Sequence, residues 1–525
     1  MAIKNTKPSI LNTPEVDELL VLCEEVMRAT PEGANRFIEP APGVLARAKS
    51  QQHNIVFGRR GSGKSSLLRK TAADLTVDRR PISFVDMETF KGHSYPDVLI
   101  SVLIKSLQEF EHWLATAATT PATKTTFWKK LFGTQPKRPP FNKTKTIELN
   151  ARLKSIIAEL EIQLRSPESA TKVIKHATSI DQSSGIELEV NASVGGIGGK
   201  TKGQSSAKSL ANKEEQSTYV SHKVEYLHQN ILLFQRFFKD LSTLSDGPSY
   251  LILDDLYHIR RSDQAKVIDY FHRAAKGNGM WLKIGTIKHR SQWYQHSDPP
   301  IGMKLGDDAR EINLDISLEK FETLREFLKK ILSNLLAEKS TLIIKDLINT
   351  TALDRLIIAS RGVTRDFVGI LSNAIAQARN RPAGDHRGTK ISAEDVNLAS
   401  GEYDPNKREE FKLDTAEDRA QLELAFNDLV NFCTATSKCN VFLIAQKLTG
   451  PTRDSVDQLI DLRLIHPVKS RVTLKRGAVG ELFEAYMLDL SQYTAARKVH
   501  QFLMVDLSAP DKDELIRKSS LIYGH

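Results

Sequence analysis

The sequence predicts an α/β fold in which a parallel sheet is followed by a helical region and a smaller C-terminal module. Three observations support this. A glycine-rich segment, 58–65, lies between a short apolar strand and a helix. Strands and helices alternate from about residue 46 to 316, which is typical of a parallel sheet with helical crossovers. A second apolar strand ends in two aspartates, Asp254 and Asp255.

Composition and charge narrow the class of protein. The 525 residues provide about two to four domains and a sizeable core. A net charge of +10 favours an anionic partner, either a nucleotide or a nucleic acid. The three cysteines are too few and too scattered for a disulfide framework, so we interpret them as structural thiols. There is no signal-peptide core and no apolar stretch of about 18 residues, so we expect a cytoplasmic protein with no membrane partner.

The glycine-rich segment fits G-x-x-x-x-G-K-[ST], the phosphate-binding loop of nucleotide hydrolases. Glycines let the backbone curl until its N–H groups point at phosphates, and the following helix N-terminus favours negative charge. Lys64 is expected to reach the outer phosphates of ATP, and the Ser65 hydroxyl to ligate Mg²⁺. The expected nucleotide-binding residues of the loop are Gly58, Arg59, Arg60, Gly61, Ser62, Gly63, Lys64, Ser65 and Ser66.

Polar residues at the ends of two later strands complete the expected site. Asp254 is expected to bind Mg²⁺ through water, and Asp255 to polarise the attacking water as a general base. Thr286 ends the next strand and is a candidate contact to the γ-phosphate, with a core threonine as the alternative. Arg290, which follows, and Arg310 compete as the cation that stabilises charge on the γ-phosphate, and each is equally well read as a surface arginine.

The expected elements follow in order. Strands are predicted at 53–57, 81–87, 250–255, 281–287 and 311–316, and helices at 16–27, 95–114, 147–165, 222–243 and 263–276, with one opening at Ser66. We divide the chain into a helical lead-in (1–45), a nucleotide-binding core (46–316), an all-helical lid (317–400), a C-terminal module (405–490) and a helical, polar tail (491–525). Within the lid, Arg365 is expected near a helix N-terminus, where it is able to lean across the nucleotide.

Residues 116–217 interrupt the alternation, so we interpret them as an insertion. The part 116–146 carries seven lysines and arginines, no acid, and interleaved aromatic residues. This composition suits either a solvated linker or a surface for single-stranded nucleic acid. A strand is predicted at 186–194, and the polar run up to about 217 is expected to be mobile.

Taken in this order, these pieces resemble the AAA+ superfamily and its relatives, the STAND signalling ATPases and the origin-recognition ATPases, over about residues 46–490. Residues 58–65 resemble the Walker A motif and 251–255 the Walker B motif, Thr286 falls at the sensor 1 position, and 362–365 resemble the sensor 2 segment. The resemblance implies ATP, Mg²⁺ and a homo-oligomer. Asp255 stands where many AAA+ enzymes have glutamate. STAND proteins often carry two aspartates there, and the resemblance to them implies slow hydrolysis and switch behaviour.

The C-terminal module resembles a winged-helix domain. Residues 442–448 and 452–464 are predicted as its helix-turn-helix, and 466–474 and 484–490 as the strands of its wing. Asp454, Asp457 and Asp461 share one face of the second helix, and such an acidic stripe would be repelled by DNA phosphates. The stripe therefore favours a protein partner, whereas basic residues of the wing, among them Lys469 and Arg471, leave DNA contacts open.

Two functions remain open at this stage. The first is an ATP-driven switch that couples nucleotide state to oligomerisation or to a protein effector. The resemblance makes plausible a role as the regulatory ATPase of a prokaryotic anti-phage defence system. The alternative is a DNA-binding ATPase of the origin-recognition or transposition type, favoured by the net charge, the basic insertion and the wing. A scaffold with a degenerate site is disfavoured because every core motif residue is present.

Overall fold

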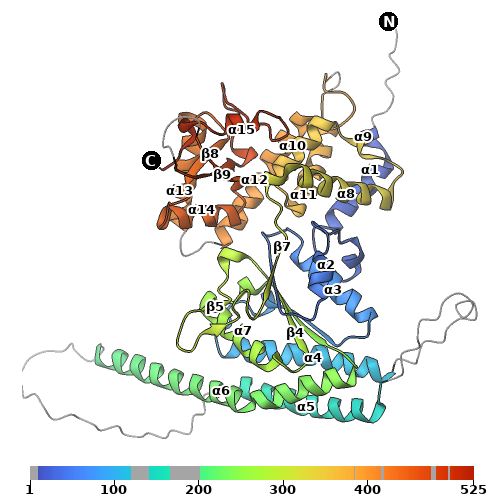
Figure 1. Ribbon diagram of the computed structural model, residues 1–525, viewed down its shortest axis with the longest axis vertical. Coiled ribbons are helices and arrows are strands. Elements are labelled where there is room, and N and C mark those ends of the chain that lie inside the picture. Colours follow the sequence, from blue (N-terminus) through green and yellow to red (C-terminus); the bar gives the residue numbers. More distant parts are fainter. Residues whose placement is uncertain are drawn as a thin grey trace, which may run out of the picture.

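The computed structural model describes residues 10–119, 141–165, 202–382, 385–414, 419–474, 480–494 and 497–524. Its central element is a five-stranded sheet in the order β2-β3-β4-β1-β7 (Figure 1). The strands are β1 (Asn54–Phe57), β2 (Ile82–Asp86), β3 (Ser249–Asp254), β4 (Met280–Thr286) and β7 (Arg310–Asn313). All neighbouring strands run parallel, which confirms the predicted fold class.

Helices cover both faces of the sheet. Because side chains alternate along a strand, Ile55 and Phe57 pack against one helical layer while Val56 packs against the other. The first layer consists of α4 (Asp97–Thr119), α5 (Lys143–Arg165), α6 (Lys202–Leu244) and α7 (Arg261–Ala275), and the second of α2 (Val44–Lys49) and α3 (Lys64–Val77). A short hairpin, β5 (Tyr294–Gln295) with β6 (Ile301–Gly302), was not predicted.

The longest helix in the described part of the chain, α6, begins within the insertion and continues into the nucleotide-binding core. Helix α6 starts at Lys202 and extends past the sheet as an arm alongside α5 (Figure 1). Residues 202–217, part of the polar run that was expected to be mobile, are therefore helical. No proline interrupts 202–244, and a continuous backbone ladder tolerates polar residues when nothing breaks it. The basic segment 120–140 and the predicted strand 186–194 lie outside the described residues.

The lid is helical, as predicted. It contains α8 (Phe321–Lys339), α9 (Ile344–Leu347), α10 (Thr350–Ser360), α11 (Thr364–Arg379) and α12 (Ala393–Asp414). The lead-in helix α1 (Pro14–Glu25) packs on the lid rather than on the sheet, since Val16 and Leu19 join the lid core. Two ion pairs support this placement: Arg379 with Asp17 at 2.8 Å, and Arg36 with Glu338 at 2.7 Å.

The C-terminal module is a three-stranded antiparallel sheet in the order β8-β10-β9. It contains α13 (Arg419–Asn431), β8 (Val441–Ala445), α14 (Pro451–Asp461), β9 (Ile465–Val472) and β10 (Phe483–Leu488). The predicted first helix at 442–448 is wrong, because this segment forms β8. A short apolar run has the same pattern in a buried strand as in a buried helix, and here pairing with β10 decides.

The tail also differs from its prediction. Beyond residue 492, the described segments contain one short α-helix, α15 (Lys512–Leu515), a 3-10 turn at Ser519–Leu521, and otherwise mostly irregular backbone. Its apolar residues Val505 and Leu507 are buried in the shared core, and Tyr523 N donates to Leu443 O at 2.8 Å. The tail therefore covers the free edge of β8, which would otherwise present unpaired backbone groups. This role needs an extended chain rather than a helix.

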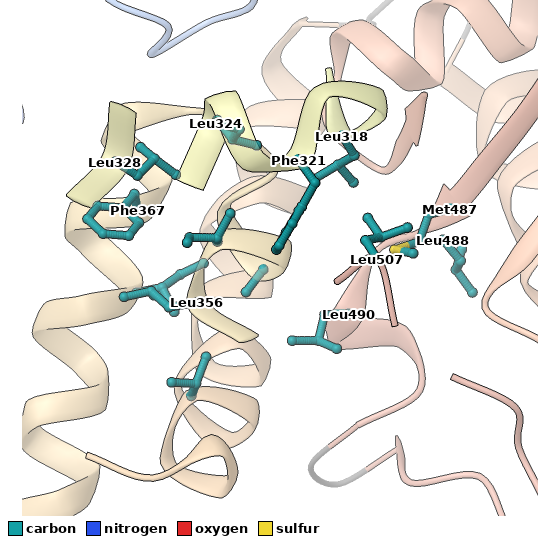
Figure 2. Close-up of a cluster of buried hydrophobic side chains, with 14 of the residues drawn as sticks. Leu318, Phe321, Leu324, Leu328, Leu356, Phe367, Met487, Leu488, Leu490 and Leu507 are labelled. Carbon is teal, nitrogen blue, oxygen red and sulfur yellow. The ribbon is translucent and has the colours of Figure 1, made fainter. Parts of the chain in front are cut away.

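One continuous apolar core joins the lid to the C-terminal module. Figure 2 shows Phe321 and Leu356 of the lid in the same cluster of buried side chains as Leu490 and Leu507 of the C-terminal part. The helices on the sheet belong to separate cores. Among the residues that the structure describes, no helix is long and apolar enough to cross a membrane.

Candidate nucleotide-binding site

The carboxyl ends of the central strands bring the predicted motifs together. Strand β4 lies between β1, which leads into the loop 58–65, and β3, which ends at Asp254. In a parallel sheet these ends share one edge, where ligands commonly bind. A cavity of about 780 Å³ lies there, lined by the loop from Arg60 to Ser66, by Asp254 and Asp255, and by Arg365 of the lid.

Glycines shape the loop. Gly61 and Gly63 adopt left-handed φ angles of 80° and 96°, which other residues adopt at a cost. A side chain at Gly61 would also collide with the lid, since its Cβ would lie 2.8 Å from Arg365 Cβ. Helix α3 begins at Lys64, two residues earlier than expected, so its N-terminus points its free N–H groups into the loop.

Lys64 is held inside the loop. Its Nζ donates to Gly58 O at 2.9 Å and to Arg59 O at 3.2 Å, and the residue is 4% exposed. Burial lowers the pKa of this amine, whereas the neighbouring Asp255 and Asp254 raise it. Lys64 is thus a buried cation opposite two carboxylates, as a phosphate-binding lysine requires.

The carboxylates of Asp254 and Asp255 are buried close to other negative charges. Burial and the neighbouring Asp255 raise the pKa of Asp254 to about 7, while a hydrogen bond from Ser65 and the charge of Lys64 lower it. Burial also raises the pKa of Asp255, which adopts a left-handed φ of 54°. Gly285 makes room for Asp254, because a Cβ there would lie 2.6 Å from its Oδ1. Two crowded carboxylates favour a cation between or beside them.

The residues present fit Mg²⁺ and ATP. Ser62 Oγ is buried and makes no hydrogen bond within the described residues, so it is available to an oxygen-rich ligand. Ser65 and Asp254 share a hydrogen bond, and they are the oxygen donors that Mg²⁺ uses together with substrate phosphates. The described residues contain no group of three or more His, Cys, Asp or Glu that would hold a metal without such a substrate.

The lid and the lead-in close the far side of the cavity. Arg365 lies in the first turn of α11, its backbone N–H donates to Gly61 O at 3.2 Å, and its Nε donates to Met27 O at 3.3 Å. The remaining wall is largely apolar and includes Phe37, Ile38, Phe327 and Ile331. Such a wall suits the base of a nucleotide.

Sequence reasoning missed part of this wall. The lead-in was predicted only as a helical segment, yet most of the residues from 26 to 40, after α1 ends, line the cavity. No local pattern marks them, because their role depends on α1 packing against the lid. Asp86, which also lines the cavity, did carry a signal: it ends strand β2, as Asp254 ends β3.

Three other predicted residues do not line the cavity. Thr286 is fully buried beside Phe57, and its hydroxyl shares a hydrogen bond with Ser291. Arg290 lies with its guanidinium 5.5 Å from the ring centre of Tyr257, which does line the cavity. Arg310 begins β7 opposite Asn54, the first residue of β1, and therefore lies at the other edge of the sheet.

Comparisons with known proteins return solved structures only. The chain matches no protein-family model and no curated protein. Structural matches include the ORC1 protein of Aeropyrum pernix in complex with DNA, with 12% identity over 91% of this chain and 89% of that chain, at a TM-score of 0.33. They also include a Walker-type ATPase of Pyrococcus abyssi, with 11% identity, 85% and 91% coverage and a TM-score of 0.38. The third is Cdc6p of Pyrobaculum aerophilum, with 10% identity, 93% and 94% coverage and a TM-score of 0.29.

These TM-scores are too low to support an argument about function. The assignment of the fold rests instead on the parallel sheet, on the loop between β1 and α3, and on the acids that end β3. Together they define a phosphate-binding-loop nucleotide hydrolase fold with a helical lid.

Proposed function

We propose that this protein is an ATP-binding and ATP-hydrolysing switch that uses Mg²⁺. The observation that carries the proposal is a single cavity lined by the loop, by Asp254 and Asp255, and by Arg365 of the lid. The loop and the two acids lie about two hundred positions apart in the sequence, and the sheet edge brings them together.

Each residue has a defined part in this proposal. The loop N–H groups and Lys64 hold the phosphates, and Ser65 and Asp254 hold the metal. Mg²⁺ bound to ATP supplies neutralisation of phosphate charge during transfer. Asp255, with its raised pKa, is placed to orient water and accept its proton at a carboxylate oxygen. Arg365 adds positive charge from the lid, close enough to influence the pKa of both Lys64 and Asp255.

The arrangement of the cores supports a switch. The lid, the lead-in and the C-terminal module share one core, whereas the sheet and its helices belong to others. The cavity has walls from both parts. A ligand that draws Arg365 and Lys64 toward the same phosphates therefore moves the C-terminal module together with the lid. We propose that this motion controls oligomerisation or engagement of a protein partner.

A DNA-binding ATPase is the second candidate function. It gains support from α14, whose acidic stripe is less negative than expected: Arg453 lies 3.2 Å from Asp457 and 2.5 Å from Glu484. Asp457 of α14 also acts on His289 of the nucleotide-binding core: burial lowers the pKa of His289, and the charge of Asp457 raises it. Part of α14 therefore faces the nucleotide-binding core rather than solvent. Repulsion between α14 and DNA is correspondingly weaker than the sequence indicated.

One series of measurements tests both functions. Steady-state ATP hydrolysis is measured first, and particle mass is then determined with and without a non-hydrolysable ATP analogue. The series is repeated with duplex and single-stranded DNA at increasing salt. ATP-dependent mass changes without DNA binding support the switch, and an affinity for DNA that falls steeply with salt supports the second function. Absence of both ATP binding and hydrolysis would sink the proposal.

A further inference from the structure

A cluster of buried charges joins the lid to the C-terminal module beside the phosphate loop. Arg361 and Asp366 come from the lid, and Arg463 and Asp489 from the module, and none is more than 4% exposed. Arg361 Nη1 lies 2.5 Å from Asp489 Oδ2, and Arg361 Nη2 lies 3.4 Å from Asp366 Oδ2. Arg463 Nη1 lies 2.6 Å from Asp366 Oδ1, so two cations and two anions balance.

The backbone of the same lid segment holds the phosphate loop at two points. Arg59 Nη2 donates to Arg361 O at 2.9 Å, and Arg365 N donates to Gly61 O at 3.2 Å. Arg59 is 5% exposed, and its carbonyl oxygen accepts the hydrogen bond from Lys64 Nζ. The segment from Arg361 to Asp366 therefore contacts the loop on both sides of Arg60, the residue between these anchor points.

The backbone at Arg361 indicates that its side chain is needed there. Arg361 ends α10 with a left-handed φ of 56°, a conformation in which glycine is favoured. A buried arginine in this conformation persists only where its surroundings compensate for the cost. Its partners do so: Asp489 holds one nitrogen, and Arg463 O accepts from the same nitrogen at 2.8 Å.

We propose that Asp489 and Arg463 of the C-terminal module are positioning residues for the phosphate loop, acting through Arg361 and Asp366. The proposal rests on the proposed function in taking the loop as the ATP site. Docking of the module then sets the affinity for ATP. A partner that favours or disfavours this docking therefore changes the affinity for ATP. Because coupling between two binding sites is reciprocal, ATP changes the affinity for that partner by the same factor.

The test compares two buried aspartates in the full-length protein. Asp489→Asn leaves Arg361 without its strongest counter-charge, and we expect the Kd for a fluorescent ATP analogue to rise roughly tenfold. Asp395→Asn is the matched control: Asp395 is also fully buried and paired with Arg381 and Arg387, but these partners do not contact the loop. We expect this control to lower stability while leaving the Kd of the folded protein within twofold of wild type.

A milder variant guards against misfolding. Arg463→Lys keeps the charge beside Asp366 but loses the planar guanidinium, and we expect a rise in Kd of about threefold with little change in Tm. The proposal is overturned if both Asp489→Asn and Arg463→Lys fold and bind within twofold of wild type. It is equally overturned if Asp395→Asn raises the Kd as much as Asp489→Asn does.

A measurement without nucleotide separates this inference from the proposed function. Hydrogen exchange of the backbone amides of residues 58–66 is followed in wild type and in both aspartate variants. Faster exchange in Asp489→Asn than in Asp395→Asn supports positioning, even if the wild type binds no ATP. Equal exchange in the two variants contradicts it.

Discussion

Buried carboxylates occur in two regions of this protein, and they are arranged in opposite ways. At the sheet edge, Asp254 and Asp255 are sequence neighbours, and the pKa of each is raised by burial and like charge. At the junction of the lid with the C-terminal module, Asp366 and Asp489 each face an arginine. Balanced buried charges join two parts of a fold, whereas crowded like charges mark a place that gains stability by binding a cation.

The nucleotide cavity and the charge cluster nonetheless share a helix of the lid, where neighbouring residues belong to different regions. Arg365 lines the cavity, while the adjacent Asp366 belongs to the charge cluster. Successive residues at the start of one helix point in different directions, so α11 contributes to both regions. Substitutions that affect one region and not the other are therefore the sharpest way to test the comparison.

The largest expected effect is on nucleotide binding by Lys64→Ala. Removing this buried cation leaves the phosphates opposite two acids, and we expect the Kd for an ATP analogue to rise at least about a hundredfold. Isothermal titration measures it. Lys70→Ala is the matched control, because Lys70 lies on the same helix but pairs with Asp74 away from the cavity. Unchanged ATP binding by Lys64→Ala means that the site is wrongly assigned.

Hydrolysis is expected to separate from binding in Asp255→Asn. Asparagine tolerates the left-handed backbone at this position, so the loop geometry is retained while the proton acceptor is lost. We expect phosphate release to fall about a hundredfold or more, with the Kd for ATP unchanged or lower. Single-turnover phosphate release measures the rate. A variant that hydrolyses ATP at the wild-type rate excludes Asp255 as the base.

The raised pKa of Asp254 predicts a pH dependence in protein free of metal and nucleotide. Since the folded state holds this proton up to about pH 7 and the unfolded state loses it near 3.8, stability falls as pH rises between these values. The loss is up to about 4 kcal/mol, taking roughly 1.4 kcal/mol for each pKa unit. Urea unfolding at pH 5 and pH 8 measures the part of this loss that falls above pH 5, which is about two thirds of it. Asp254→Asn is expected to remove this part of the pH dependence, and an unchanged slope would contradict the assignment.

The smallest effect is expected for Thr286→Val. Because the Thr286 hydroxyl shares a hydrogen bond with Ser291 and does not line the cavity, its contribution requires that the site rearranges when ATP binds. If it then contacts the γ-phosphate, hydrolysis falls about tenfold, whereas Ser291→Ala has little effect. Equal, small losses in the two variants would instead indicate a core threonine. Steady-state kinetics of the pair decide between these outcomes.

The placement of the loop between a strand and a helix, and of the acids at a strand end, was predictable from sequence because it depends on neighbours along the chain. The loop requires glycines, lysine and serine at set spacings between a strand and a helix, and all of these are local features. Asp254 follows from the same logic, since an acid after a buried strand reaches the sheet edge. By contrast, residues 442–448 were predicted as a helix because their apolar pattern fits a buried helix as well as a buried strand. Pairing with β10, which is distant in the sequence, makes this segment a strand.

The sequence by itself determined the α/β class, the loop, the twin acids and the helical lid, because each depends on local propensity and short spacings. Only the tertiary structure decided that the lead-in forms part of the cavity, that the tail covers β8, and that Arg361 connects Asp489 to Arg59. Tyr523 contacts Leu443, 80 positions earlier, and Arg361 contacts Asp489 and Arg59, each more than a hundred positions away. Such contacts arise from the packing of whole elements against one another, which no local pattern of residues encodes.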